Sequence, residues 1–210
     1  YIKKQAAFAV IGLIIMFLVS KINYFYLKFL AIPAYGISLI LLILVLVIGT
    51  GKYDEKRWLD LGLFNVQPSE VAKIGIILML SLYISRYYKH MKGFVKGILI
   101  PGILIGAAAI LIILEPHMSG TVLVLMIGLI LMIIGGSSFK YLTIFGSAAM
   151  AGLIYVLTQT DYMTNRIEIW RNPGADPQGG GFQTLQSLYA VGSGGLFGLG
   201  LGKSRKKYLY

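Results

Sequence analysis

The sequence predicts an all-α, polytopic membrane protein. Of its 210 residues, 57% are hydrophobic and only 13% are charged, whereas an ordinary soluble domain is roughly 25% charged. The hydrophobic residues gather in long runs, separated by short segments that are basic or contain glycine and proline. A run of about 20 apolar residues is what a helix needs to cross the hydrocarbon core of a bilayer. These observations exclude a water-soluble globule.

Six runs are expected to be membrane-spanning helices, because a backbone in lipid must form its hydrogen bonds within its own segment. The predicted spans are residues 6–20, 29–49, 68–85, 94–114, 119–135 and 139–158. The polar, glycine-rich residues 160–210 follow them and are predicted to form a large extracytoplasmic loop. A short, mildly amphipathic helix beginning at Gln183 would lie in the membrane interface. Residues 1–210 are expected to form a single membrane domain, a fragment of a longer protein.

Charge predicts which ends of the spans face the cytoplasm. Lysine and arginine are more frequent in one set of alternating connections, and the positive-inside rule places that set in the cytoplasm. It contains Lys21, Lys28, Arg86, Lys89, Lys92, Lys96 and Lys140. The eight acidic residues then fall on or near the outer face. Carboxylate chemistry is therefore expected outside the cell, and the net charge of +11 is attributed to contact with lipid headgroups, not to nucleic acid.

The chain lacks the residues that several classes of functional site require. Cysteine is absent, which excludes disulfides, a thiol nucleophile and cysteine-ligated zinc, and two isolated histidines argue against a histidine-rich metal site. The glycine-rich end fails the P-loop pattern at Phe197 and the dinucleotide pattern at Lys203. No nucleotide cofactor is expected.

Glu70 and Lys73 lie one turn apart near the start of the third predicted span, on one face of the helix. Pairing reduces the cost of placing a charge close to the bilayer. Two interpretations stay open at this point: a purely structural ion pair, and a pair that lines a polar cavity. Glu115 to Thr121 separates two spans by a tight turn, in which His117 is either an ordinary surface residue or a proton shuttle.

Asp176 lies in the segment richest in polar and turn-forming residues, between Arg166 and Gln183. Asn-Pro-Gly and Asp-Pro are turn sequences, and an aspartate that begins a turn commonly accepts hydrogen bonds from its own backbone. The sequence therefore leaves open whether Asp176 is a turn residue or a reactive carboxylate.

Taken together, four sequence blocks resemble the SEDS family (shape, elongation, division and sporulation), which includes RodA, FtsW and SpoVE. They occur in the family's order over nearly the whole chain. The blocks are Arg57-Trp58; Gln67-Pro68-Ser69-Glu70-xx-Lys73; Glu115-Pro116-His117-Met118-Ser119-Gly120-Thr121; and Asn172-Pro173-xx-Asp176-Pro177-x-Gly179-x-Gly181-Phe182-Gln183 with the glycines and Lys207 that follow. Many RodA-type members have Gln-Pro-Asp in place of Glu115-Pro116-His117, and this chain is more similar to the division and sporulation branch.

The resemblance implies a ten-helix protein, of which this chain would lack the first helix and the last three. It also implies an activity at the outer face of the bacterial cytoplasmic membrane: polymerisation of lipid II, the undecaprenyl-pyrophosphate-linked disaccharide peptide, alongside a class B penicillin-binding transpeptidase. The family's proposed catalytic carboxylate maps onto Asp176, and its Glu-x-x-Lys maps onto Glu70 and Lys73.

The chemistry of such a reaction suits these residue types. Joining an α-linked pyrophosphate donor into a β-linked chain inverts the anomeric carbon, so one displacement with one general base suffices, and Asp176 is the expected base. Cations must stabilise the departing pyrophosphate. The expected substrate-binding residues are Arg57, Glu70, Lys73, Arg166, Arg171, Gln183 and Lys207. A divalent cation, Mg²⁺ or Mn²⁺, could bridge the pyrophosphate and a carboxylate, but no ligand cluster in the sequence demands a metal.

Two other functions compete with the glycosyltransferase. A lipid II flippase would use Glu70 and Lys73 to line a hydrophilic path, and a non-catalytic scaffold would recruit a partner through small-residue helix faces such as Gly102 and Gly106. A flippase needs polar residues through the bilayer, whereas the centres of these spans carry almost no charge. The sequence therefore favours the enzyme, and it leaves open whether the enzyme serves elongation, division or sporulation.

Overall fold

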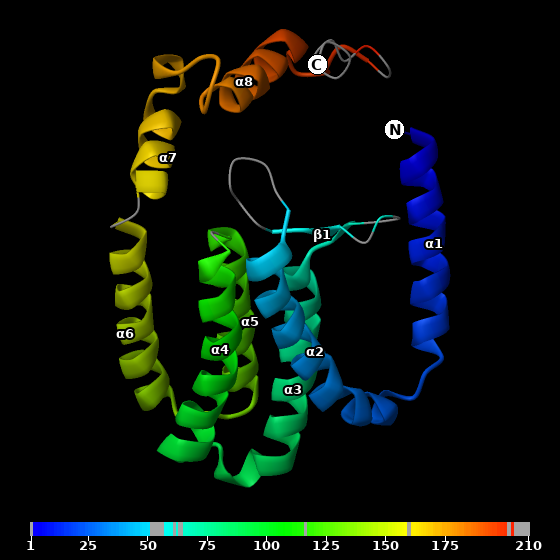
Figure 1. Ribbon diagram of the computed structural model, residues 1–210, viewed down its shortest axis with the longest axis vertical. Coiled ribbons are helices and arrows are strands. Elements are labelled where there is room, and N and C mark those ends of the chain that lie inside the picture. Colours follow the sequence, from blue (N-terminus) through cyan, green and yellow to red (C-terminus); the bar gives the residue numbers. More distant parts are fainter. Residues whose placement is uncertain are drawn as a thin grey trace. The chain divides into compact units, whose positions relative to one another are not determined.

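A computed structural model describes residues 2–50, 57–60, 62, 65–115, 117–158, 161–200 and 203, most of them helical (Figure 1). The chain divides into two compact units, Tyr1–Gly146 and Ser147–Tyr210. The long helices are α1 (Ile2–Ser20), α2 (Leu27–Ile48), α3 (Pro68–Tyr87), α4 (Ile100–Leu114), α5 (Met118–Ile134) and α6 (Phe139–Thr158), and the boundary between the units falls within α6.

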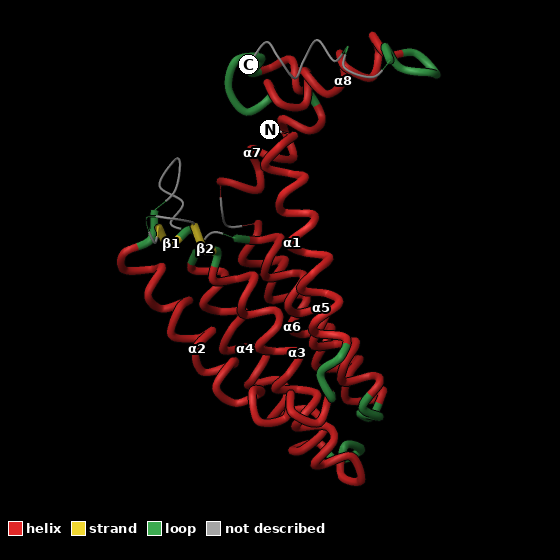
Figure 2. The backbone as a smooth tube through the Cα atoms, turned by 90° about the vertical axis from the view of Figure 1, so that its right-hand side faces the viewer, coloured by secondary structure: helices red, strands yellow, loops and turns green. Residues whose placement is uncertain are grey.

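Helices α2, α3, α4 and α5 form the bundle of the first unit and lie side by side (Figures 1 and 2). Short helical turns extend them: 3₁₀ turns at Tyr24–Tyr26 and Tyr88–His90, and a π-helical turn at Val95–Leu99 that leads into α4. Each of the six predicted spans thus coincides with a helix. The all-α membrane class is confirmed, and three helical stretches are long and apolar enough to span a bilayer: Tyr24–Ile48, Pro68–His90 and Val95–Leu114.

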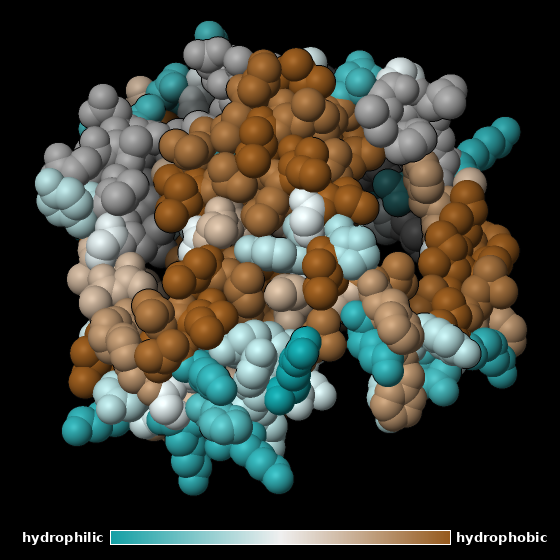
Figure 3. Space-filling model, turned by 60° about the horizontal axis from the view of Figure 1, so that its bottom comes forward, coloured by the Kyte–Doolittle hydropathy of each residue, from teal (hydrophilic) through white to brown (hydrophobic). Residues whose placement is uncertain are grey.

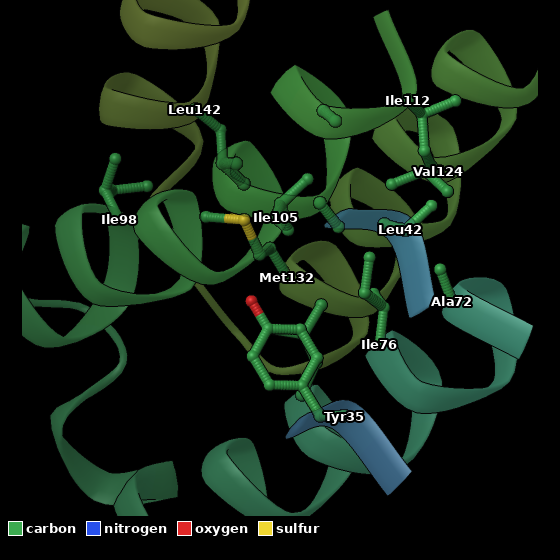
Figure 4. Packing of buried hydrophobic residues seen from close by; sticks show 13 residues of the cluster. Tyr35, Leu42, Ala72, Ile76, Ile98, Ile105, Ile112, Val124, Met132 and Leu142 are labelled. Carbon is green, nitrogen blue, oxygen red and sulfur yellow. The ribbon is translucent and has the colours of Figure 1, made fainter. Parts of the chain in front are cut away.

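The bundle is held together by a continuous apolar core. Leu42, Ile76, Ile112 and Val124, one from each helix of the bundle, are buried to within 1% of complete burial and pack against one another (Figure 4). Gly75 of α3 allows a close contact with α2, because a Cβ there would lie only 2.9 Å from Ser38 Oγ of α2. The core therefore fixes where the ends of α2 and α3 lie.

The outer surface of the bundle is apolar. Large hydrophobic side chains are exposed along α2 and α4, and also along α1 outside the bundle, as expected where lipid is the solvent. Figure 3 shows broad apolar surfaces, with hydrophilic side chains gathered mainly along the lower border of that view. This distribution is typical of a protein that crosses a membrane.

A small β-hairpin joins α2 to α3. Strand β1 (Leu59–Asp60) pairs antiparallel with β2 (Asn65–Val66). The turn between them uses Gly62 at a φ of 80°, a conformation that favours glycine, and the Asp60 carboxylate accepts a hydrogen bond from the Gly62 amide at 2.8 Å. The hairpin was not predicted, because two-residue strands leave no alternating pattern in a sequence.

The second unit contains two further helices. Helix α7 (Asp161–Arg171) is followed by a 3₁₀ turn (Pro173–Ala175) and by α8 (Phe182–Gly194). The predicted interfacial helix beginning at Gln183 corresponds to α8, whereas α7 was not predicted as a separate helix. Asp176 lies in the turn between these two helices.

Candidate active site

Residues from three segments of the chain meet at one end of the α2–α5 bundle. We call this group of residues the polar end: Arg57, Gln67, Ser69, Glu115 and His117. The Arg57 Nε donates a long hydrogen bond of 3.4 Å to the main-chain carbonyl of Glu115. Ser69 Oγ lies 3.1 Å from His117 Nδ1, and Gln67 Nε2 lies 3.5 Å from the same atom. Three of the four sequence blocks are thus brought together.

Local sequence explains this arrangement. Pro68 occupies the first turn of α3, where its missing N–H has no helical partner to lose, so Gln67 and Ser69 flank the point where the helix begins. A Cβ at Gly120 would lie 2.7 Å from His117 Nδ1, so the glycine leaves room for the imidazole ring. The Thr121 hydroxyl donates to the His117 carbonyl at 3.2 Å. The turn between α4 and α5 therefore directs His117 towards α3, and His117 is not the ordinary surface residue that a lone loop histidine suggests.

Glu115 is the unusual residue of the polar end. It is 0% exposed, and neither carboxylate oxygen has a hydrogen-bond partner among the described residues. Burial raises the pKa of the Glu115 carboxyl from its usual 4.5 to about 7, although the nearby positive charge of Arg57 lowers it. Glu115 was not among the predicted site residues, since the sequence alone does not show that the end of α4 is covered.

Glu70 and Lys73 form the expected ion pair in the first turns of α3. The Lys73 Nζ lies 2.7 Å from Glu70 Oε1 and 2.7 Å from Oε2. The side chain of Lys73 is 22% exposed and that of Glu70 is 58% exposed, so the pair lies at a solvent-accessible helix end. A structural role and a substrate-binding role are both compatible with this position.

In the second unit, the Asp176 carboxylate is held by its own loop. Oδ1 accepts a hydrogen bond from the Gly179 amide at 3.0 Å, and Oδ2 accepts one from the Gly180 amide at 2.7 Å. The Asp176 side chain is nevertheless exposed. A carboxylate has about four lone-pair positions, so each oxygen can accept one more hydrogen bond. The turn role and the reactive role of Asp176 do not exclude each other.

The other predicted site residues of the second unit precede or follow this loop in the sequence. Arg166 and Arg171 are exposed on α7, and Gln183 is exposed in the first turn of α8. Lys207 lies outside the described residues. Within the part of the chain that the structure describes, no three histidine or carboxylate side chains are grouped as metal ligands. A divalent cation at the pyrophosphate therefore stays an untested prediction.

The matches to known proteins extend over all of these blocks. The cell cycle protein family that comprises FtsW, RodA and SpoVE matches residues 1–210. The chain belongs to this family. The resemblance to SEDS proteins that the sequence blocks indicated is thereby confirmed.

Curated FtsW and SpoVE relatives align with the whole chain. Stage V sporulation protein E of Bacillus subtilis is 36% identical over 216 residues, which cover 100% of this chain and 58% of that protein. A probable peptidoglycan glycosyltransferase FtsW of Thioalkalivibrio sulfidiphilus is 38% identical over 212 residues, which cover 100% of this chain and 53% of that protein. The chain thus spans rather more than half the length of the curated relatives it matches.

Solved structures share the fold. The crystal structure of Thermus thermophilus rod shape determining protein RodA has a TM-score of 0.58 and 31% identity, and the match covers 72% of this chain and 49% of RodA. A peptidoglycan synthase complex, studied for the coordination of polymerization and crosslinking, has a TM-score of 0.70 and 32% identity over 92% of this chain and 57% of that one.

Proposed function

We propose that this chain is part of a membrane-embedded glycosyltransferase that polymerises lipid II into peptidoglycan strands, with Asp176 as the general base. Membership of the FtsW/RodA/SpoVE family supports a role in cell-wall synthesis, and relatives named as peptidoglycan glycosyltransferases support the reaction type. The observation that carries the assignment of the base is the exposed Asp176 carboxylate, fixed by two backbone amides in a loop of small residues.

The reaction requires one proton acceptor. The acceptor hydroxyl oxygen attacks the anomeric carbon of the donor as the bond from that carbon to the pyrophosphate oxygen breaks. The hydroxyl proton passes to an Asp176 oxygen, directly or through one water, and the electron pair of the broken bond leaves with the undecaprenyl pyrophosphate. Pyrophosphate leaves without prior protonation, so the second carboxylic acid that glycoside hydrolysis requires is unnecessary here.

Positive side chains are needed where negative charge develops on the leaving group. Arg166 and Arg171 belong to the same unit as Asp176, and the planar fork of arginine suits two phosphate oxygens at once. Arg57 and Lys73 are the candidates from the first unit. Lys73 is paired with Glu70 at 2.7 Å. A divalent cation could share this role, and the proposal does not depend on one.

A class B penicillin-binding transpeptidase is the proposed protein partner, working with this chain at the outer face of the bacterial cytoplasmic membrane. Support comes from the structural similarity to a chain of a complex that coordinates polymerization with crosslinking. Crosslinking consumes newly made strands, so a polymerase and a transpeptidase acting at one site would process the same product in turn.

The alternative of a lipid II flippase receives less support. A hydrophilic path would need polar side chains along the bundle, yet Glu115, at the very end of α4, is the only charged residue among the described buried ones. A few hydroxyls are buried, such as that of Ser38 in α2 and that of Ser137 in the loop between α5 and α6, and both donate to main-chain carbonyls. An apolar interior fits a scaffold for a reaction at one face better than a transport path.

The substitution Asp176→Asn tests the proposed function. In the complete purified protein with fluorescent lipid II, we expect no glycan ladder on a gel, because the amide cannot accept the proton. A ladder of unchanged yield and length would reject Asp176 as the base. A liposome flipping assay on the same variant tests the alternative, since a flippase that relies on Glu70 and Lys73 should be unaffected by Asp176→Asn.

A further inference from the structure

The turn after Asp176 is built from its own backbone. Besides the two amides that bind the carboxylate, the Gly181 amide donates to the Asp176 main-chain carbonyl at 3.0 Å. Two donors on two different carboxylate oxygens restrict both the position of the carboxylate and its rotation about the last side-chain bond. Three consecutive glycine amides thus bind one aspartate.

The three glycines differ in what a side chain would meet. A Cβ at Gly179 would collide with the Asp176 carboxylate itself and would lie 2.8 Å from its Cγ. A Cβ at Gly181 would collide with the main-chain carbonyl of Pro173. A Cβ at Gly180 would meet the terminal methyl group of Ile169, which is the far end of a flexible side chain and can move.

We propose that Gly179 and Gly180 are positioning residues for the Asp176 carboxylate, with Gly179 needed for the space that its missing side chain leaves. This inference rests on the proposed function of Asp176. The two amides hold the carboxylate in one orientation before substrate arrives, and the oxygen positions that they leave unoccupied remain open to the acceptor hydroxyl. Gly181 has a different part, because its substitution would disturb the main chain of the turn.

Fixing the base in advance matters for the rate. An exposed aspartate on a loop samples several rotamers, and only some of them point at the hydroxyl. A reacting group displaced by about 1 Å can lose about 100-fold in rate. Alanine at position 179 would keep the backbone N–H but force the carboxylate out of its place, so the chemical step should suffer while substrate binding does not.

The experiment compares Gly179→Ala with Gly180→Ala and with Gly192→Ala in the complete protein, using lipid II. Gly192 is the matched control, because a Cβ there meets nothing within 4 Å and Gly192 lies in α8, away from the carboxylate. We expect Gly179→Ala to lower kcat about 100-fold, with KM within twofold of the wild type and an unchanged melting temperature. Gly180→Ala should lose less, and Gly192→Ala should match the wild type.

Wild-type kcat in Gly179→Ala, or equal losses in Gly179→Ala and Gly192→Ala, would overturn the inference. If Gly179→Ala does not fold, hydrogen exchange of the peptide covering residues 176–183 gives a second test: the amides of Gly179 and Gly180 should exchange faster in Asp176→Ala than in the wild type, and equal rates would overturn the proposal. Full activity in Asp176→Asn would instead reject the proposed base, whatever the exchange rates show.

Discussion

At the scale of single residues, Glu115 and Asp176 show opposite ways of placing a carboxylate. Asp176 is exposed and receives two backbone hydrogen bonds, whereas Glu115 is fully buried with no hydrogen-bond partner among the described residues. An unpaired buried charge is costly, so the protonated form of Glu115 is favoured. The sequence pointed to Asp176 as the base through its resemblance to the SEDS family, because the turn motif alone left the role of Asp176 open. It gave no signal that Glu115 is buried, because burial of a helix end depends on what packs over it.

Glu115 should make stability depend on pH. Its pKa of about 7 lies above the usual 4.5, so the folded protein binds the proton more tightly than the unfolded chain. The stabilisation is complete below about pH 4.5 and is lost as the pH rises through about 7. We expect the melting temperature in detergent to fall by several degrees between pH 5.5 and pH 8.5. Glu115→Gln should remove this part of the fall, and an identical fall in both proteins would contradict the assignment.

The pair of Glu70 and Lys73 should matter more for substrate than for stability. Because Glu70 is 58% exposed, solvent screens the pair, and a double-mutant cycle with Glu70→Gln and Lys73→Gln should give a coupling free energy below about 1 kcal/mol. If the pair binds the donor, either substitution raises KM for lipid II. A large coupling energy with unchanged KM would favour the purely structural interpretation.

At the scale of elements, the long helices could be predicted from the sequence, whereas the irregular segments that connect or follow them could not. Long apolar runs can only be helices in lipid, so α1 to α6 were expected close to where they lie. The π-helical turn at Val95–Leu99, the β-hairpin and α7 were missed. The π-helical turn is held in part by a tertiary contact, since the Tyr83 hydroxyl donates to the Lys96 carbonyl at 2.9 Å, and such a contact has no periodic signature in the sequence.

Alanine substitutions at helix glycines distinguish packed helix faces from open ones. Gly75→Ala would place a Cβ 2.9 Å from Ser38 Oγ and 3.2 Å from the Ala34 carbonyl oxygen, so α2 and α3 must move apart at a cost of about 1–3 kcal/mol. Gly102→Ala is the control, since the described residues place no atom within 4 Å of its Cβ. Thermal unfolding in detergent should show a lower melting temperature for Gly75→Ala alone. Equal melting temperatures would contradict the packing of α2 on α3.

At the scale of the whole molecule, the sequence predicted a membrane protein of the correct family. The structure shows in addition that separate sequence motifs lie together. Arg57, Ser69 and His117 come from three separate blocks whose convergence at one end of the bundle follows only from the order and direction of the helices. Composition cannot supply that information. The predictions that residues 160–210 form an extracytoplasmic loop and that the chain works with a transpeptidase remain to be tested.

The central claim is that the Asp176 carboxylate accepts the proton in glycan polymerisation. The most direct measurement is the initial rate of strand formation by Asp176→Asn in the complete protein, with lipid II binding measured on the same sample. General-base catalysis contributes about 10²- to 10⁴-fold, so we predict a rate loss in that range with binding unchanged. A rate within a few-fold of the wild type, in a variant that binds lipid II normally, would contradict the account.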